Sequence, residues 1–160
     1  MLSKFKKKKK EEWRAYLNGE LIPICQVPDE IFSTKMMGEG VAIIAESGVL
    51  CSPCDGTIVL IAPTKHAMAI KASAGIQALI HIGLDSAGLP ENCFEVLVEE
   101  GNKVKQGQPL IKIASSYLAT TENLYVPLVI VENTEQKSLY LSQDTVNVKQ
   151  GESVILSYDQ

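Results

Sequence analysis

The chain of 160 residues lacks long apolar stretches. No run approaches the roughly 20 residues that a membrane-spanning helix needs. The amino terminus also lacks the apolar core and cleavage site of a secretory signal peptide. These absences argue against a protein that crosses a membrane with helices, and we expect a cytoplasmic one.

Histidine and cysteine are scarce, with two and four residues respectively. Neither an H-x-H nor an H-E-x-x-H pattern occurs, so the usual spacing of a zinc enzyme is missing. Cys51 and Cys54 form a C-x-x-C that could be a redox pair or half of a zinc site. Cys25 and Cys93 lack the short spacing of a second half, and a cytosolic chain keeps its thiols reduced. We therefore expect four buried thiols.

Apolar residues make up 46% of the sequence, which is enough for one well-buried domain. From Leu21 onward, short runs rich in Val and Ile alternate with turn residues, and helical periodicity is almost absent. This pattern predicts an all-β antiparallel sandwich or barrel. The expected strands are 21–26, 41–45, 57–62, 67–71, 78–83, 94–98, 109–114, 126–131, 138–141, 145–148 and 153–157.

Charge is distributed unevenly along the chain. Residues 1–14 hold six Lys and one Arg against two Glu, a balance of +5, whereas the other residues balance to −9. An acidic body repels nucleic acid and suits a basic protein partner. We therefore expect no nucleic-acid binding by the domain.

Residues 1–18 are expected to form a basic tail, flexible or amphipathic, in front of a domain at 19–160. On a helical wheel Leu2, Phe5, Trp13 and Tyr16 share one stripe, which suits an anionic membrane surface at the inner face. The alternative is a disordered solubilising arm, because a run of lysines repels itself.

The two histidines, His66 and His81, each interrupt an apolar segment. Alternation sends Ile80 and Ile82 to one face of a strand and His81 to the other, together with Leu79. By the same count His66 is in step with Met68. If the two strands pair, the imidazoles can meet on one shallow apolar surface, where a neutral ring is a nucleophile near pH 7.

Several motifs are similar to those of enzyme IIA of the glucose family of the bacterial sugar phosphotransferase system. The residues that carry this resemblance are 27–43, Ser52-Pro53-Cys54-Asp55-Gly56-Thr57, Pro63-Thr64-Lys65-His66-Ala67, Leu79-Ile80-His81-Ile82-Gly83-Leu84-Asp85, Val104-Lys105-Gln106-Gly107 and Pro127-Leu128-Val129-Ile130. The resemblance implies a compact antiparallel β-sandwich of the duplicated hybrid motif type. It also implies a free-standing phosphocarrier for glucose-type sugar uptake, a phosphotransferase component without a cofactor.

By this resemblance His81 is the phosphorylated residue, His66 its neighbouring partner and Thr64 a supporting hydroxyl. Physical chemistry agrees, because a phosphoryl group brings close to two negative charges. Burying an unpaired ion costs on the order of tens of kcal/mol, so the site must be shallow and lined with donors. Backbone N–H groups near Gly83 are expected to contribute.

The resemblance further implies two protein partners that dock in turn. The phosphocarrier protein HPr donates the phosphoryl group, and a cysteine of a sugar-specific IIB domain accepts it. Some relatives also bind and restrain other permeases or kinases when unphosphorylated. The residues that match the family's docking surface are Asp29, Ile31, Phe32, Met36, Met37, Leu79 and Asp85.

Two other functions remain open on the residues alone. Residues 98–110 resemble part of a biotinyl or lipoyl carrier, although the lysine that would carry the cofactor is missing. A zinc-binding β domain is the other, since His66, His81 and a carboxylate such as Asp85 could hold a metal. Adventitious zinc at His66 and His81 is a weaker form of the second alternative.

Overall fold

The structure, a computed structural model, describes residues 9–86 and 89–160. Its main feature is an eight-stranded sheet in which every neighbouring pair of strands is antiparallel. The strand order is β13 (Val146–Val148), β2 (Gly19–Pro23), β3 (Gly40–Ala45), β11 (Tyr125–Asn133), β7 (Ile76–His81), β6 (Ala67–Lys71), β5 (Gly56–Ile61) and β9 (Lys103–Val104).

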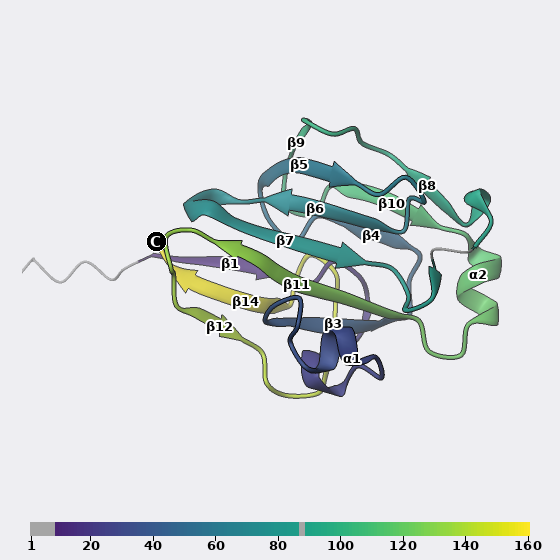
Figure 1. Cartoon of the computed structure of the whole chain (residues 1–160), viewed down its shortest axis with the longest axis horizontal. Helices are drawn as coiled ribbons and strands as arrows, with labels where there is room; N and C mark the ends of the chain where they lie inside the picture. Colours follow the sequence, from purple (N-terminus) through teal and green to yellow (C-terminus); the bar gives the residue numbers. More distant parts are fainter. Residues whose placement is uncertain (1–8, 87–88) are drawn as a thin grey trace, which may run out of the picture.

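Two antiparallel three-stranded sheets complete the fold, and β1 and β14 lie behind the large sheet in the view of Figure 1. One contains β1 (Lys10–Arg14), β14 (Val154–Asp159) and β12 (Leu139–Leu141), and the other contains β4 (Val49–Cys51), β10 (Pro109–Ile113) and β8 (Phe94–Val96). The helices are short: α1 (Glu30–Ser33), α2 (Ser115–Thr120), η1 (Ile24–Gln26), η2 (Ser73–Gly75) and η4 (Glu91–Cys93). The predicted all-β antiparallel sandwich is confirmed.

Alternation along the central strands divides the apolar side chains between two clusters. Ala78 and Ile80 of β7 belong to the main core, together with Trp13 and Leu156 from the sheet behind. Residues of the opposite parity face the other side, where Phe32 closes a smaller cluster. That cluster comprises Ile22, Ile24, Val27, Phe32, Ala42 and Val129. In Figure 1, α1 lies beside β3 on this face, and His81 at the end of β7 is half-buried.

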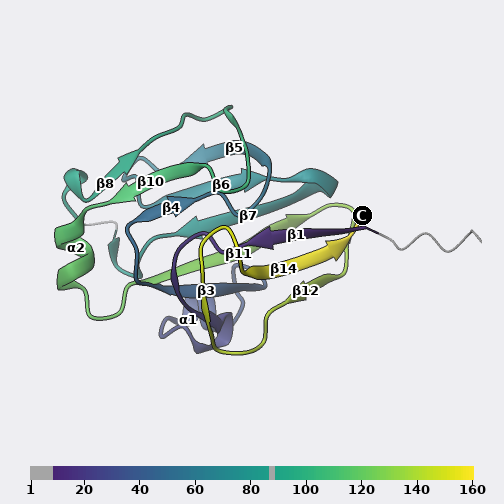
Figure 2. The ribbon, with the colours of Figure 1, turned by 180° about the vertical axis from the view of Figure 1, so that it is seen from behind.

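The predicted tail at 1–18 is wrong for residues 10–18. Residues Lys10–Arg14 form β1 and pair with β14, where Trp13 is opposite Leu156 (Figure 2). Trp13 and Tyr16 are fully buried, and the Tyr16 hydroxyl donates to the Val126 carbonyl at 2.6 Å. Both side chains therefore belong to the core and are not part of a membrane-facing stripe. Residues 1–8, including the rest of that stripe, lie outside the described residues.

No helix within residues 9–86 and 89–160 combines the length and the apolar character needed to cross a membrane. The cysteines differ from one another more than expected. Cys51 and Cys54 are buried, Cys93 is partly buried and Cys25 is exposed. The expectation of four buried thiols was therefore wrong for Cys25, which lies in η1 beside the small cluster.

Candidate functional site

The two histidines meet at the end of β6 and β7. His81 is the last residue of β7 and pairs with Ala67, and His66 directly precedes β6. Their ring centroids are 4.7 Å apart, with an angle of 79° between the ring planes. Both side chains are partly buried. The expected convergence of the imidazoles is therefore present in the structure.

A break in the strand brings the rings to one face. By count His66 is in step with Met68, which is buried in the main core opposite Ile80. His81, one residue beyond Ile80, faces the other side, so a continuous strand would have separated the rings. β6 instead begins after His66, and Lys65 lies in the left-handed region with φ 64°. The strand parity expected for His66 was therefore wrong, because a turn and not a strand orients its ring.

A backbone contact fixes the protonation pattern of His81. Its Nδ1 lies 2.6 Å from the Gly83 carbonyl oxygen. A carbonyl only accepts hydrogen bonds, so Nδ1 carries the proton and the lone pair of the neutral ring is on Nε2. From the sequence, N–H groups near Gly83 were expected to contribute to the site. The structure instead uses the Gly83 carbonyl for His81 and its N–H for the Tyr125 carbonyl, at 2.8 Å.

The Gly83 backbone adopts a conformation that favours glycine. Its φ is 78°, and a Cβ at this position would lie 2.7 Å from the Tyr117 hydroxyl of α2. Tyr117 is therefore a neighbour of the site that reasoning from the sequence missed, whereas Gly83 was expected there for its backbone N–H and contributes its carbonyl instead. The His-Ile-Gly spacing was the available signal, because a glycine two residues beyond a site histidine indicates a turn that returns to it.

Thr64 holds the second ring. Its hydroxyl forms a hydrogen bond with Nδ1 of His66 across the turn that precedes β6. This contact orients the imidazole through one nitrogen and leaves Nε2 for a ligand. Thr64 itself is exposed, so the pair lies at the surface and not in a deep pocket.

Both imidazoles are poised in the neutral state. Burial lowers the pKa of His81, against smaller opposing effects of the Gly83 hydrogen bond and the Asp29 charge. Burial also lowers the pKa of His66, and repulsion from His81 adds to that effect. Since the ordinary value is about 6.5, the neutral form of each ring predominates at pH 7.

The expected docking residues separate into exposed and buried members. Ile31, in α1, and Met36, three residues after its end, are 49% and 77% exposed. Met37 and Leu79 pack partly buried against the small cluster. Phe32 is buried, with its ring centroid 5.5 Å from that of His81. Phe32, which the resemblance matches to the docking surface, is thus a buried residue that packs against the His81 ring.

The two acidic positions also differ. Asp29 is the N-cap of α1, and its carboxylate accepts the Ile31 N–H at 3.0 Å. This contact satisfies a helix donor and places a negative charge near His81. Asp85 is exposed in the segment that follows β7.

The metal and redox alternatives gain no support from the side-chain geometry. In the part of the chain that the structure describes, no group of three His, Cys, Asp or Glu side chains could hold a metal ion. The histidine pair thus offers zinc two ligands, fewer than a stable site uses. Burial raises the pKa of both Cys51 and Cys54, which keeps these thiols protonated and poorly reactive.

Comparison with known proteins assigns the chain to a family. Residues 11–137 match the sequence profile of the phosphoenolpyruvate-dependent sugar phosphotransferase system, EIIA 1. The solved structure of glucose permease IIA from Mycoplasma capricolum superposes with a TM-score of 0.82 at 30% sequence identity, covering 93% of this chain and 96% of that chain. These findings also displace the biotinyl or lipoyl carrier alternative. The chain belongs to the EIIA 1 family of the phosphoenolpyruvate-dependent sugar phosphotransferase system and is one of its phosphocarrier components.

Proposed function

We propose that Nε2 of His81 accepts the phosphoryl group from phospho-HPr and passes it to a cysteine of a IIB domain. As an EIIA protein the chain interacts with HPr and with IIB domains of sugar permeases. The observation that carries the residue assignment is the bond between His81 Nδ1 and the Gly83 carbonyl. With the proton held on Nδ1, the free lone pair of the neutral His81 ring is on Nε2, and this ring lies beside that of His66.

His66 stabilises the transferred charge in this proposal. A phosphoryl group on His81 is close to a dianion at pH 7 and needs donors around it. His66 lies close enough to supply an N–H, and the approaching negative charge favours its protonated form. Thr64 acts as a positioning residue, because it touches the His66 ring and orients it.

Donor and acceptor use one docking surface, formed by Ile31, Met36, Met37 and Leu79 around the histidine pair. Ile31 and Met36 are the exposed members of this surface, and the buried Phe32 packs against the His81 ring. Phosphoryl transfer needs in-line positioning and charge stabilisation more than a deep pocket. A flat surface therefore suffices once a partner covers it and excludes water. Methionine side chains adapt to partners of different shape.

Three further roles extend this proposal. We propose that the phosphoryl transfer takes place in the cytoplasm. We also propose that the lysine-rich residues 4–10 attract the protein to an anionic membrane surface. The unphosphorylated form is also proposed to bind and restrain other permeases or kinases. Pull-down with and without phosphoenolpyruvate, enzyme I and HPr tests the last role, which fails if no partner is retained by the unphosphorylated protein.

A phosphorylation assay tests the central assignment. The protein is incubated with phosphoenolpyruvate, enzyme I and HPr, and acid-labile phosphate is measured in the wild type, His81→Gln and His66→Gln. We expect no stable label in His81→Gln, and label that is accepted but poorly passed on in His66→Gln. Because the chain has only two histidines, acid-labile label that persists in His81→Gln would move the acceptor to His66.

A further inference from the structure

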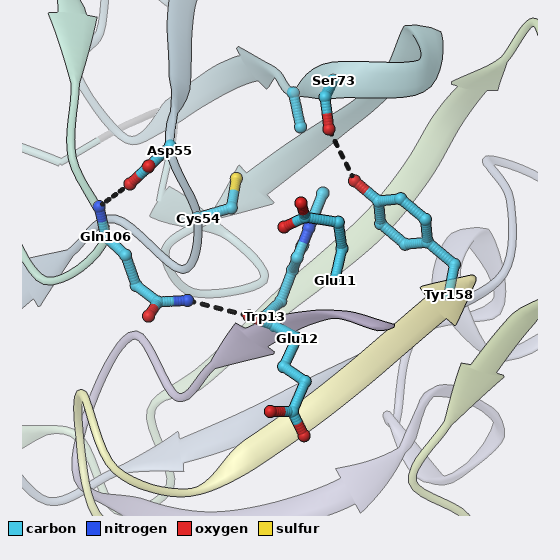
Figure 3. Close-up of a pocket in the computed structure, with 9 residues that line it drawn as sticks. Glu11, Glu12, Trp13, Cys54, Asp55, Ser73, Gln106 and Tyr158 are labelled. Carbon is cyan, nitrogen blue, oxygen red and sulfur yellow. Dashed lines mark hydrogen bonds between the residues drawn. The ribbon is translucent and has the colours of Figure 1, made fainter. Parts of the chain in front are cut away.

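The cavity between β1, β14 and the segments before β5 and after β6 is lined by polar groups that pair with one another (Figure 3). Asp55 accepts the backbone N–H of Gln106 at 2.8 Å, and the Ser73 and Tyr158 hydroxyls are 3.2 Å apart. The Trp13 indole adjoins the Tyr158 hydroxyl. Groups that are satisfied in this way give no indication of a ligand.

The turn before β6, in contrast, contains a lysine in a conformation that favours glycine. The Lys65 N–H donates to the Ala62 carbonyl at 2.8 Å, and the Ala62 N–H donates to the Ala67 carbonyl at 2.9 Å. Residues 63–66 therefore connect β5 and β6 as a tight hairpin loop, in which Lys65 has φ 64°. Hairpin loops of this kind place a residue in the left-handed region, where glycine or asparagine is the favoured choice. Lysine at this position carries backbone strain.

Four residues other than glycine have a positive φ in the part of the chain that the structure describes. Lys65 differs from the rest because it lies between two residues of the histidine site, Thr64 and His66. Backbone strain clusters at functional sites, where the side chain that causes it has a use. The conformation of Lys65 therefore points to a function of its side chain. The other three residues are Lys35, Ala74 and Gln136.

The charges around the histidine pair suggest what this function is. A phosphoryl group brings close to two negative charges, and the Asp29 charge already acts on His81. Lys65 is partly buried, and among residues 9–86 and 89–160 it belongs to no ion pair. Its Cα lies about 3.8 Å from that of His66, and its flexible four-carbon stem lets the ammonium reach groups around the His66 ring.

We propose that the Lys65 ammonium stabilises the phosphoryl group on His81, and that lysine occupies the strained position for this reason. This inference rests on the proposed assignment of His81 as the acceptor. The bond from phosphorus to HPr breaks as the bond to Nε2 of His81 forms, and neither a bond nor a proton passes to Lys65. Its positive charge offsets part of the charge that arrives, which favours the phosphorylated protein over the unphosphorylated one.

The equilibrium of the phosphoryl group between HPr and this protein tests the role. Phospho-HPr is prepared with phosphoenolpyruvate and enzyme I, separated from both and mixed with the full chain, and the label on each protein is measured once it is constant. We expect Lys65→Asn to lower the equilibrium constant in favour of this protein about 5-fold, as for one charge at about 4 Å in water. Lys65→Arg should stay within about 2-fold of the wild type. A contact that only aids docking would change the forward and reverse rates alike and leave the equilibrium unchanged.

Stability provides a second measurement with a matched control. Lys65→Asn should raise the midpoint of denaturant unfolding, because asparagine tolerates the left-handed conformation. Gln136→Asn is the control: the Gln136 N–H closes the same kind of turn on the Asn133 carbonyl at 3.0 Å, with φ 50°. This turn follows the last residue of β11, at the end of the strand away from Tyr125 and the Gly83 turn. Gln136→Asn should raise the midpoint similarly and leave the phosphoryl equilibrium unchanged.

The outcomes separate this inference from the assignment on which it rests. An unchanged equilibrium in Lys65→Asn, with the wild type labelled on His81, would overturn the role of Lys65 and leave His81 as the acceptor. A wild type without label on His81 would overturn both. Equal losses in Lys65→Arg and Lys65→Asn would show that charge is not the cause, and an equal loss in Gln136→Asn would assign the effect to relief of strain. Either of these results would also overturn the role of Lys65.

Discussion

At the scale of single residues, the proposed phosphorylation of His81 depends on which nitrogen of its ring carries a proton. The Gly83 carbonyl holds the proton on Nδ1, and Nε2 is nucleophilic only while the ring as a whole is neutral. Burial, which lowers the pKa of His81, therefore widens the pH range over which the protein can accept a phosphoryl group.

We accordingly predict that His81 titrates below the ordinary histidine value of about 6.5. Phosphoryl acceptance from HPr should stay level as the pH falls from 8 to 6.5 and decline only below that. The unfolded chain, with an ordinary histidine pKa, binds protons more readily than the folded chain. The free energy of unfolding should therefore be highest above about pH 6.5 and should fall as the pH drops below that value. NMR titration of the two imidazoles, assigned with His66→Gln, measures the midpoints.

Asp29→Asn provides the matching control for the pH prediction. Asparagine also caps helices, so α1 keeps its N-cap while the charge near His81 disappears. Since the Asp29 charge raises the pKa of His81, its removal should lower that pKa further. A His81 midpoint above 6.5 in the wild type would contradict the prediction.

Gly83→Ala should impair both folding and phosphorylation. The residue has φ 78°, and the new Cβ would meet the Tyr117 hydroxyl at 2.7 Å. We expect a loss of more than about 1 kcal/mol in the free energy of unfolding and slower phosphorylation, because the carbonyl that orients His81 moves. Denaturant unfolding and the rate of label uptake measure the two effects.

The chain offers a control and a rescue for this substitution. Gly101 has φ 91°, and a Cβ added there would meet no atom within 4 Å, so Gly101→Ala carries the backbone strain alone and should leave the phosphorylation rate unchanged. Adding Tyr117→Phe to Gly83→Ala removes the atom that the Cβ meets and should restore part of both losses. Equal effects of Gly83→Ala and Gly101→Ala on phosphorylation would argue against a role for the Gly83 carbonyl.

Sequence patterns located His66, His81 and Thr64 but not the contacts that organise them. Hydrogen bonds to a backbone carbonyl, such as that of Gly83, depend on the course of the chain and not on the identity of a side chain. The burial of Phe32 was missed for a similar reason. A four-residue helix is too short to show a periodicity that separates Phe32 from its exposed neighbour Ile31.

At the scale of elements, α1 connects the fold to the proposed docking surface. Its N-cap and the buried Phe32 fix the helix on the small cluster, and this attachment presents Ile31 to solvent. We predict that Ile31→Asp lowers kcat/KM for phosphoryl transfer from HPr at least about 10-fold, as for a central interface residue. The free energy of unfolding should change by less than about 0.5 kcal/mol, since the site is exposed.

Val154→Asp is the control for the α1 prediction. Val154 is 39% exposed, on β14 of the sheet behind the histidine face. The same charge is introduced there at a similar apolar position, so transfer from HPr should be unaffected. If both variants slow transfer equally, added charge and not a local contact is the cause, and Ile31 does not belong to the docking surface.

Most strands could be predicted because they lie in the eight-stranded sheet, where burial imposes a regular apolar pattern. The expected strand at 67–71 coincides with β6, β3 begins one residue earlier than expected, and β5 is displaced by one residue at both ends. β1 was missed because its residues are charged except for Trp13, and its pairing with distant β14 leaves no local signal. Helix α2, with six residues, is likewise too short to be recognised by periodicity.

At the scale of the whole molecule, we infer from the charge asymmetry that electrostatic attraction brings partners to the site. Residues 15–160 carry a net charge of −9 with His neutral, and Asp29 and Asp85 lie on either side of the histidine pair in the sequence. An acidic body of this kind attracts a partner with a basic docking face over a distance of about one Debye length. Such steering acts on the association rate more than on the final affinity.

We therefore predict that the rate of transfer from phospho-HPr falls several-fold when NaCl is raised from about 0.05 to 0.5 M, as the Debye length shrinks. In the double variant Asp29→Asn with Asp85→Asn, the dependence should be weaker, whereas Asp144→Asn, an exposed position between β12 and β13, should keep the wild-type dependence. Measurement at pH 8 keeps His81 neutral in every variant, so its pKa does not enter the comparison. Equal salt dependence in all three proteins would mean that the acidic residues beside the site do not steer HPr, and the apolar surface around Ile31 would then determine the encounter alone.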